Sequence, residues 1–90
     1  MRRVQYSVRA LSQLASLHEN LITRNPSEAH QIAAIIARTI ARIRELPMLG
    51  RPTDEGNVYL IVEREYRYRI FYSIGGGQIY IIRILGSGQA

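Results

Sequence analysis

The stretch EYRYRIFYSIGGGQIYIIRIL, residues 65–85, decides the fold of this chain. Two apolar runs lie on either side of three consecutive glycines at positions 75–77. Glycine permits the positive φ angles that tight hairpin turns need. The stretch therefore predicts two antiparallel strands, 66–74 and 78–85, with all three glycines in the turn.

This hairpin predicts which side chains share a face of the sheet. With a three-glycine turn Ile74 pairs with Gln78, so Arg69 lies directly opposite Arg83. One face should be apolar and pack on helices: Tyr68, Ile70, Tyr72, Tyr80, Ile82 and Ile84. The other face should mix arginine with apolar residues: Arg67, Arg69, Phe71, Ile79, Ile81, Arg83 and Leu85.

The predicted pair of opposed arginines requires a compensating charge. Like charges directly opposite each other destabilise a sheet by about 0.2–1 kcal/mol. Glu63 and Glu65 could supply the compensating charge from within the chain, which would leave the face merely solvated. Alternatively, a bound phosphate or a partner's carboxylate supplies it, and the face then suits an acidic, partly apolar peptide or a nucleic acid. A two-residue turn would instead place Arg69 and Arg83 on opposite faces.

The first half of the chain carries two helix signals. Ser7 is a good N-cap, and leucines recur at three- and four-residue steps after it, which predicts a helix at 8–23. Asn25 and Pro26 then start a second helix, with Glu28 completing a capping-box pattern. This helix should end near Leu46, because proline follows it.

The remaining segments complete an α+β architecture. Residues 3–6 alternate polar and apolar side chains, as a short strand does, and 58–63 reads as another strand. The segment 47–57 has two prolines and two glycines, which predicts a loop. The order is β-α-α-β-β-β in a single domain, residues 1–90, with a helical hairpin packed on one face of an antiparallel sheet.

Composition limits the possible functions. Apolar residues make up 47% of the chain and charged residues 21%, which is typical of a globular protein. All twelve basic residues are arginine, and the net charge of +5 favours an acidic partner. There is no cysteine, and His18 and His30 stand on separate segments, so we expect no metal site and no cofactor. No apolar run is long enough for a membrane span, and we expect a cytoplasmic protein.

Three local patterns give the chain a family resemblance. They are Leu-Pro-Met-Leu-Gly-Arg-Pro at 46–52, Tyr-Arg-Ile-Phe-Tyr at 68–72 and Ile-Ile-Arg-Ile-Leu at 81–85. Together with the element order, they resemble the RelE/ParE superfamily of toxins from bacterial toxin–antitoxin pairs. The resemblance implies one of two activities: RelE-like members cleave messenger RNA on the ribosome, and ParE-like members poison DNA gyrase. Both are silenced by an antitoxin whose C-terminal segment wraps the toxin.

The residues favour the ParE-like branch. Metal-free RNA cleavage needs a base, an acid and positive groups for the phosphate. Arg69 and Arg83 could hold a phosphate, but the chain has no lysine, and 86–90 contains neither histidine nor tyrosine. Tyr72 and Tyr80 are expected to face the helices. The tail histidine of many relatives is also missing, so an inactive relative that only binds antitoxin is a third possibility.

These arguments define the expected site and partners. The candidates for contact with the target or the antitoxin are Arg51, Arg67, Arg69 and Arg83. The candidates for apolar packing of the antitoxin are Leu11, Leu14, Ile35 and Leu46. The expected partners are a cognate antitoxin, in a hetero-oligomer, and DNA gyrase, with the ribosome and messenger RNA as the alternative target.

Overall fold

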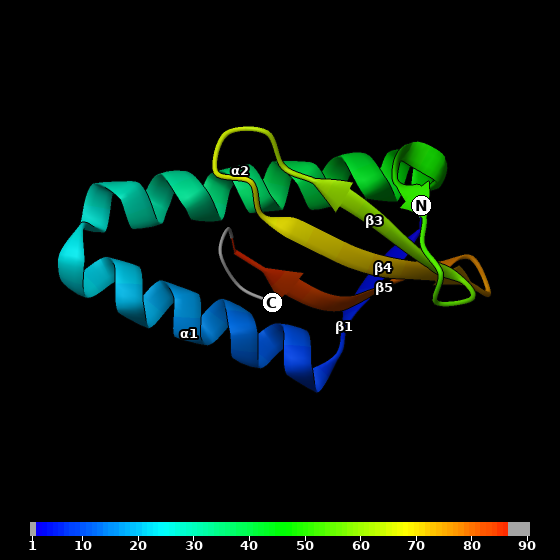
Figure 1. Cartoon of the computed structure of the whole chain (residues 1–90), viewed down its shortest axis with the longest axis horizontal. Helices are drawn as coiled ribbons and strands as arrows, with labels where there is room; N and C mark the ends of the chain where they lie inside the picture. The colour runs from blue at the N-terminus through cyan, green and yellow to red at the C-terminus, as the bar shows by residue number, and fades with distance from the viewer. Residues whose placement is uncertain (1, 87–90) are drawn as a thin grey trace.

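The structure is a computed structural model that describes residues 2–86. It has two long helices and five strands (Figure 1). The elements are β1 (Arg3–Tyr6), α1 (Val8–Arg24), α2 (Pro26–Glu45), the 3-10 helix η1 (Pro47–Leu49), β2 (Arg51–Pro52), β3 (Val58–Val62), β4 (Arg69–Gly75) and β5 (Gln78–Leu85). The predicted α+β fold is confirmed, and the segment predicted as a loop contains the short elements η1 and β2.

Both helices start where their caps predict. The Ser7 hydroxyl oxygen accepts the backbone N–H of Ala10 at 2.9 Å. The Asn25 side-chain oxygen accepts the N–H of Glu28 at 3.2 Å, and Pro26 takes the first helical position. Each of these caps satisfies a backbone donor that the first turn would otherwise leave unpaired. The short connection at Asn25 makes α1 and α2 the two arms of a hairpin, as Figure 1 shows.

The five strands form one mixed sheet with the order β1-β5-β4-β3-β2. All neighbouring strands are antiparallel except β1, which runs parallel to β5. The prediction of a purely antiparallel sheet was therefore wrong at one edge. The connection from β1 passes through both helices before the chain returns to the sheet, and such long crossovers permit parallel pairing.

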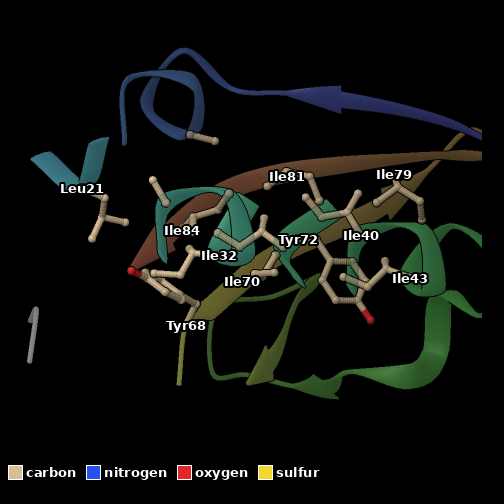
Figure 2. Packing of buried hydrophobic residues seen from close by; sticks show 13 residues of the cluster. Leu21, Ile32, Ile40, Ile43, Tyr68, Ile70, Tyr72, Ile79, Ile81 and Ile84 are labelled. Carbon is tan, nitrogen blue, oxygen red and sulfur yellow. The ribbon is translucent and has the colours of Figure 1, made fainter. Parts of the chain in front are cut away.

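The core lies between the helix pair and one face of the sheet. Both helices and the strands β4 and β5 contribute side chains to it, and Figure 2 shows the ring of Tyr72 among them. The largest fully buried side chains are Tyr72, Ile43, Ile70, Ile79 and Ile81. Within residues 2–86, no helix combines the length and the apolar character needed to cross a membrane.

The predicted register of the β4–β5 hairpin was wrong. Gly75 pairs with Gln78, so the turn consists of Gly76 and Gly77 alone, with φ angles of 56° and 71°. Positive φ at both central residues is the requirement of the type I′ hairpin turn. A register shift then follows further along the hairpin, between Phe71 and Tyr72. As a result Arg69 lies opposite Leu85, and Arg83 lies opposite Phe71.

The corrected register also changes the predicted faces of β5. Ile79 and Ile81 are fully buried in the core and do not lie beside the arginines. Tyr80 lies across from Ser73 on the other side of the sheet and is 38% exposed. Ile82 has no partner in β4, because Ile81 pairs with Tyr72 and the next pair already uses Arg83. Ile82 is thus the extra residue of a β-bulge.

Candidate binding face of the sheet

The sheet face away from the helices carries three of the four predicted arginines. Paired residues on neighbouring strands point to the same side of a sheet. One row across the strands reads Arg51, Leu60, Phe71 and Arg83, and the next reads Val62, Arg69 and Leu85. These two rows, together with the pair Ser73 and Tyr80, are called the outer face below.

The fourth arginine lies elsewhere. Arg67 is in the turn before β4, has a φ angle of 63° and is exposed. Its backbone is in the left-handed region that non-glycine residues seldom adopt. The carboxylate of Glu63 organises this turn, since it accepts the backbone N–H of Glu65 and, at 2.8 Å, that of Tyr66. Glu63 is therefore committed to backbone donors and is only 5% exposed.

Two side chains, Phe71 and Glu55, hold Arg83 on the outer face. Its guanidinium carbon lies 3.9 Å from the centre of the Phe71 ring, which is a cation–π contact. Its two terminal nitrogens donate to the two carboxylate oxygens of Glu55. These hydrogen bonds are the main reason that the pKa of Glu55 is lowered, and the charges of Arg83 and Arg9 lower it further.

Glu55 is thus the residue that neutralises Arg83. The sequence left this role open between Glu63 or Glu65 and a bound phosphate or partner carboxylate, and it did not point to Glu55. Glu55 lies 28 positions away from Arg83 in the chain, in the loop between β2 and β3. The only signal in the sequence was an acidic residue in a turn rich in proline and glycine, and such residues are common in loops. The pairing depends on where the loop falls on the sheet, which spacing does not reveal.

The loop that carries Glu55 is held by hydrogen bonds within the loop itself. The N–H and the hydroxyl of Thr53 both donate to the carbonyl of Val58, at 2.9 and 2.8 Å. The N–H of Glu55 donates to the Thr53 hydroxyl at 3.1 Å, and the carbonyl of Glu55 accepts the N–H of Val58. Gly56 supplies a positive φ of 48°. The backbone of this loop is therefore ordered without any help from Arg83.

Tyr72 links the core to the edge of the outer face. Its hydroxyl donates to the carbonyl of Pro47 at 2.6 Å and accepts the N–H of Gly50 at 2.8 Å. A Cβ atom at Gly50 would lie 2.6 Å from that hydroxyl, so only glycine fits there. Burial raises the pKa of Tyr72, and the hydrogen bond from Gly50 partly opposes this rise. The tyrosine thereby holds η1 in place and fixes where Arg51 begins β2.

A groove of about 500 Å³ runs between α2 and β3. Its apolar lining includes Ile35, Leu49 and Val62, and its charged lining comes from α2 and from the turn that follows β3. Within residues 2–86, β2 pairs only with Tyr59 and Leu60, so the second half of β3 has no strand partner on this side. The groove thus combines an open strand edge with apolar and positive side chains. Its complete lining is Ile35, Arg38, Thr39, Arg42, Leu49, Ile61, Val62, Glu63, Arg64 and Glu65.

The four residues predicted to pack the antitoxin lie in different places. Ile35 is buried at the floor of the groove beside α2, and Leu46 is 60% exposed just beyond the end of that helix. Leu14 lies between the two helices, where it packs against the core. Leu11 is 53% exposed on α1. The structure therefore does not bring them together into one patch.

The helical hairpin on this mixed sheet defines a class of protein, the RelE/ParE-like toxin fold. A family model described as the ParE toxin of the type II toxin–antitoxin system parDE matches residues 4–90. The chain therefore belongs to the ParE toxin family. A comparison with curated proteins found no match.

Three solved structures show the same fold. A structure of the chromosomal ParDE toxin–antitoxin system from P. aeruginosa matches with a TM-score of 0.81 and 17% identity, covering 93% of this chain and 94% of that chain. The intact E. coli RelBE toxin–antitoxin complex matches with a TM-score of 0.69 and 15% identity over 100% of both chains. The isolated E. coli RelE toxin matches with a TM-score of 0.70 and 14% identity, covering 100% of this chain and 88% of that chain.

Proposed function

We propose that this ParE-family toxin inhibits DNA gyrase by binding to it and is neutralised by a cognate antitoxin. The observation that carries the proposal is the chemistry of the outer face. Three arginines stand there among Leu60, Phe71 and Leu85, which suits a partner that is acidic and partly apolar. A protein surface offers that combination.

The same face argues for binding rather than catalysis. Cleavage of RNA without a metal requires a group that takes a proton near neutral pH and another that returns one. The chain has no lysine, and its two histidines, His18 and His30, lie on α1 and α2. Tyr72 is committed to Pro47 and Gly50 on the helix side. Glu55 is engaged with Arg83 and has a lowered pKa, which makes it a weaker base.

We assign the antitoxin to the groove between α2 and β3. An extended peptide can add to an open strand edge and place alternate side chains in neighbouring pockets. The half of β3 without a strand partner offers the backbone groups, and Ile35 and Leu49 offer apolar contact. Three arginines, Arg38, Arg42 and Arg64, outnumber the two glutamates of the lining, which favours an acidic segment. The related ParDE and RelBE structures are toxin–antitoxin assemblies, which supports a hetero-oligomer here.

One observation favours a second candidate, the RelE-like messenger RNA endonuclease. Tyr80, which was expected to face the helices, lies on the outer face with Arg69 and Arg83. Tyr80 and Arg83 are in adjacent rows of that face, and a phenol next to a guanidinium group could take part in proton transfer at a bound phosphodiester. In this second reading Arg69 and Arg83 hold the phosphate.

A paired assay separates the candidates. Purified protein is added to a gyrase supercoiling reaction and, in parallel, to translating ribosomes with a reporter message. Inhibited supercoiling with intact message supports the proposal, and loss of inhibition in Arg69→Ala/Arg83→Ala would assign it to the outer face. Cleaved message that becomes intact with Tyr80→Phe would replace the proposal with the nuclease. Silence in both assays, with tight antitoxin binding, would identify an inactive relative that only binds antitoxin.

A further inference from the structure

The outer face contains a complete site for one carboxylate, and a carboxylate of the same chain fills it. Arg83 offers both terminal nitrogens to Glu55 in the two-pronged geometry that guanidinium groups use for carboxylates. Phe71 supports the flat face of the guanidinium from below, with the guanidinium carbon 3.9 Å from the ring centre. The site therefore consists of an aromatic ring, a guanidinium group stacked on it and a carboxylate bound to that guanidinium group.

The occupant can leave without unfolding the segment that carries it. Hydrogen bonds among Thr53, Glu55 and Val58 hold the loop backbone, and none of them involves Arg83. The Glu55 side chain is 54% exposed, whereas that of Arg83 is 18% exposed. A rotation of the Glu55 side chain into solvent would open the site and leave Arg83 on its aromatic support.

We propose that Glu55 is a tethered competitor, and that an acidic segment of a partner protein displaces it to reach Arg83 and Phe71. The site already binds a carboxylate, and its neighbour Leu60 is apolar and partly exposed, which favours an acidic peptide over a nucleic acid backbone. The inference rests on the proposed function only in taking the outer face as a binding surface. Its consequence is a partner affinity lower than Arg83 alone would give.

The size of this effect follows from competition. The apparent affinity is the intrinsic affinity multiplied by the fraction of molecules in which the site is open. Exposed ion pairs of this kind are closed for a modest majority of the time. Removing the competitor should therefore tighten binding by about 2- to 6-fold.

The test uses the full chain and the peptide acetyl-Glu-Glu-Glu-amide as the probe. Binding is followed by NMR at low ionic strength through the side-chain N–H signal of Arg83, so that contacts at other arginines do not interfere. Glu55→Gln should bind the probe at this signal about 2- to 6-fold more tightly than the wild type. Asp54→Asn is the matched control, because it removes the same charge from the adjacent position of the same loop. Its affinity at the Arg83 signal should stay close to that of the wild type.

Three outcomes would overturn the inference. Equal tightening in Glu55→Gln and Asp54→Asn would mean that general electrostatics is responsible. Unchanged affinity in Glu55→Gln would mean that Glu55 does not compete for the site. Tightening in Glu55→Gln that persists when Arg83→Gln is added, read from the backbone signal of Phe71, would place the binding elsewhere. None of these results depends on gyrase, so a failed supercoiling assay would leave the inference standing.

Discussion

Replacing Tyr72 with phenylalanine removes one oxygen atom from the point where the core meets the β2 edge. The hydroxyl donates to the carbonyl of Pro47 at 2.6 Å and accepts the N–H of Gly50 at 2.8 Å. Gly50 is buried, so water cannot replace the lost acceptor without a rearrangement. A buried donor left unpaired costs about 1–3 kcal/mol, and we expect Tyr72→Phe to lower the free energy of unfolding by that amount.

Thermal and chemical unfolding measure this loss directly. In a domain of this size 1 kcal/mol corresponds to about 4–8 °C, so the melting temperature should fall by about 5–20 °C. Native-state hydrogen exchange locates the damage. The Gly50 amide should exchange faster in Tyr72→Phe by more than the global loss of stability explains, because the segment that begins β2 loses its anchor to the core.

Tyr66→Phe provides the matched control. Its hydroxyl donates to the Gln31 side chain at 2.9 Å, but this hydrogen bond is exposed to solvent. Water replaces a lost partner there, so the change in unfolding free energy should stay within about 0.5 kcal/mol. If Tyr72→Phe proved as mild as Tyr66→Phe, the two hydrogen bonds would contribute nothing net. The view that Tyr72 fixes the start of β2 would then be wrong.

Three further predictions concern other parts of the molecule. Ser7→Ala removes the cap of α1 and the hydroxyl that donates to the carbonyl of Ile82 at 2.6 Å. Urea unfolding should show that the free energy of unfolding falls by about 1–2 kcal/mol, whereas Ser12→Ala should change it little. In the same assay Glu63→Gln should lower the free energy of unfolding by about 1–3 kcal/mol, because an amide offers one acceptor oxygen to the two backbone donors that Glu63 accepts. A decrease below about 0.5 kcal/mol would contradict the role of Glu63 in this turn. Because the folded pKa of Glu55 is lowered from 4.5, its stabilising effect is present above that pH and is lost as pH falls through the folded value. The wild type should therefore lose more stability than Glu55→Gln on acidification below about pH 4.5, and parallel curves would refute the linkage.

The helices and their limits could be predicted because the determinants are local. Ser7, Asn25 and Pro26 act within one turn of the residues they cap, so their spacing in the sequence is also their spacing in space. The same holds for the end of α2, where Pro47 prevents continuation. The bounds of β5, Gln78–Leu85, were predicted for the same reason, because an apolar run follows directly after the three glycines.

The candidate site depends on contacts between segments that are distant in the sequence, and the sequence alone did not predict these contacts. Glu55 meets Arg83 only because the loop after β2 lies over the outer face. Three consecutive glycines allow turns of two or three residues, and a change of one residue moves every later side chain of β5 to the other face. The sequence therefore predicted the right kind of hairpin with the wrong partners for Arg69 and Arg83.

The bulge at Ile82 explains how the outer face nevertheless gathers its arginines. The two-glycine turn sets Tyr72 opposite Ile81, and without a bulge the same register would pair Arg83 with Ile70 on the core side. A guanidinium group buried there without a partner would be strongly unfavourable. One extra residue reverses the alternation, so that Ile84 enters the core and Arg83 returns to the outer face.

A bulge leaves backbone groups without strand partners, and here α1 and its cap supply the replacements. The Ser7 hydroxyl donates to the carbonyl of Ile82, and the Gln13 side-chain oxygen accepts the N–H of Ile84 at 2.7 Å. These two polar residues at the start of α1 compensate for the irregularity that the core requires. Ser7 and Gln13 thus support the irregular part of β5 that places Arg83 on the outer face. Ser7 and Gln13 bond the backbone of the residues on either side of Arg83, so substitution of either should shift the position of Arg83.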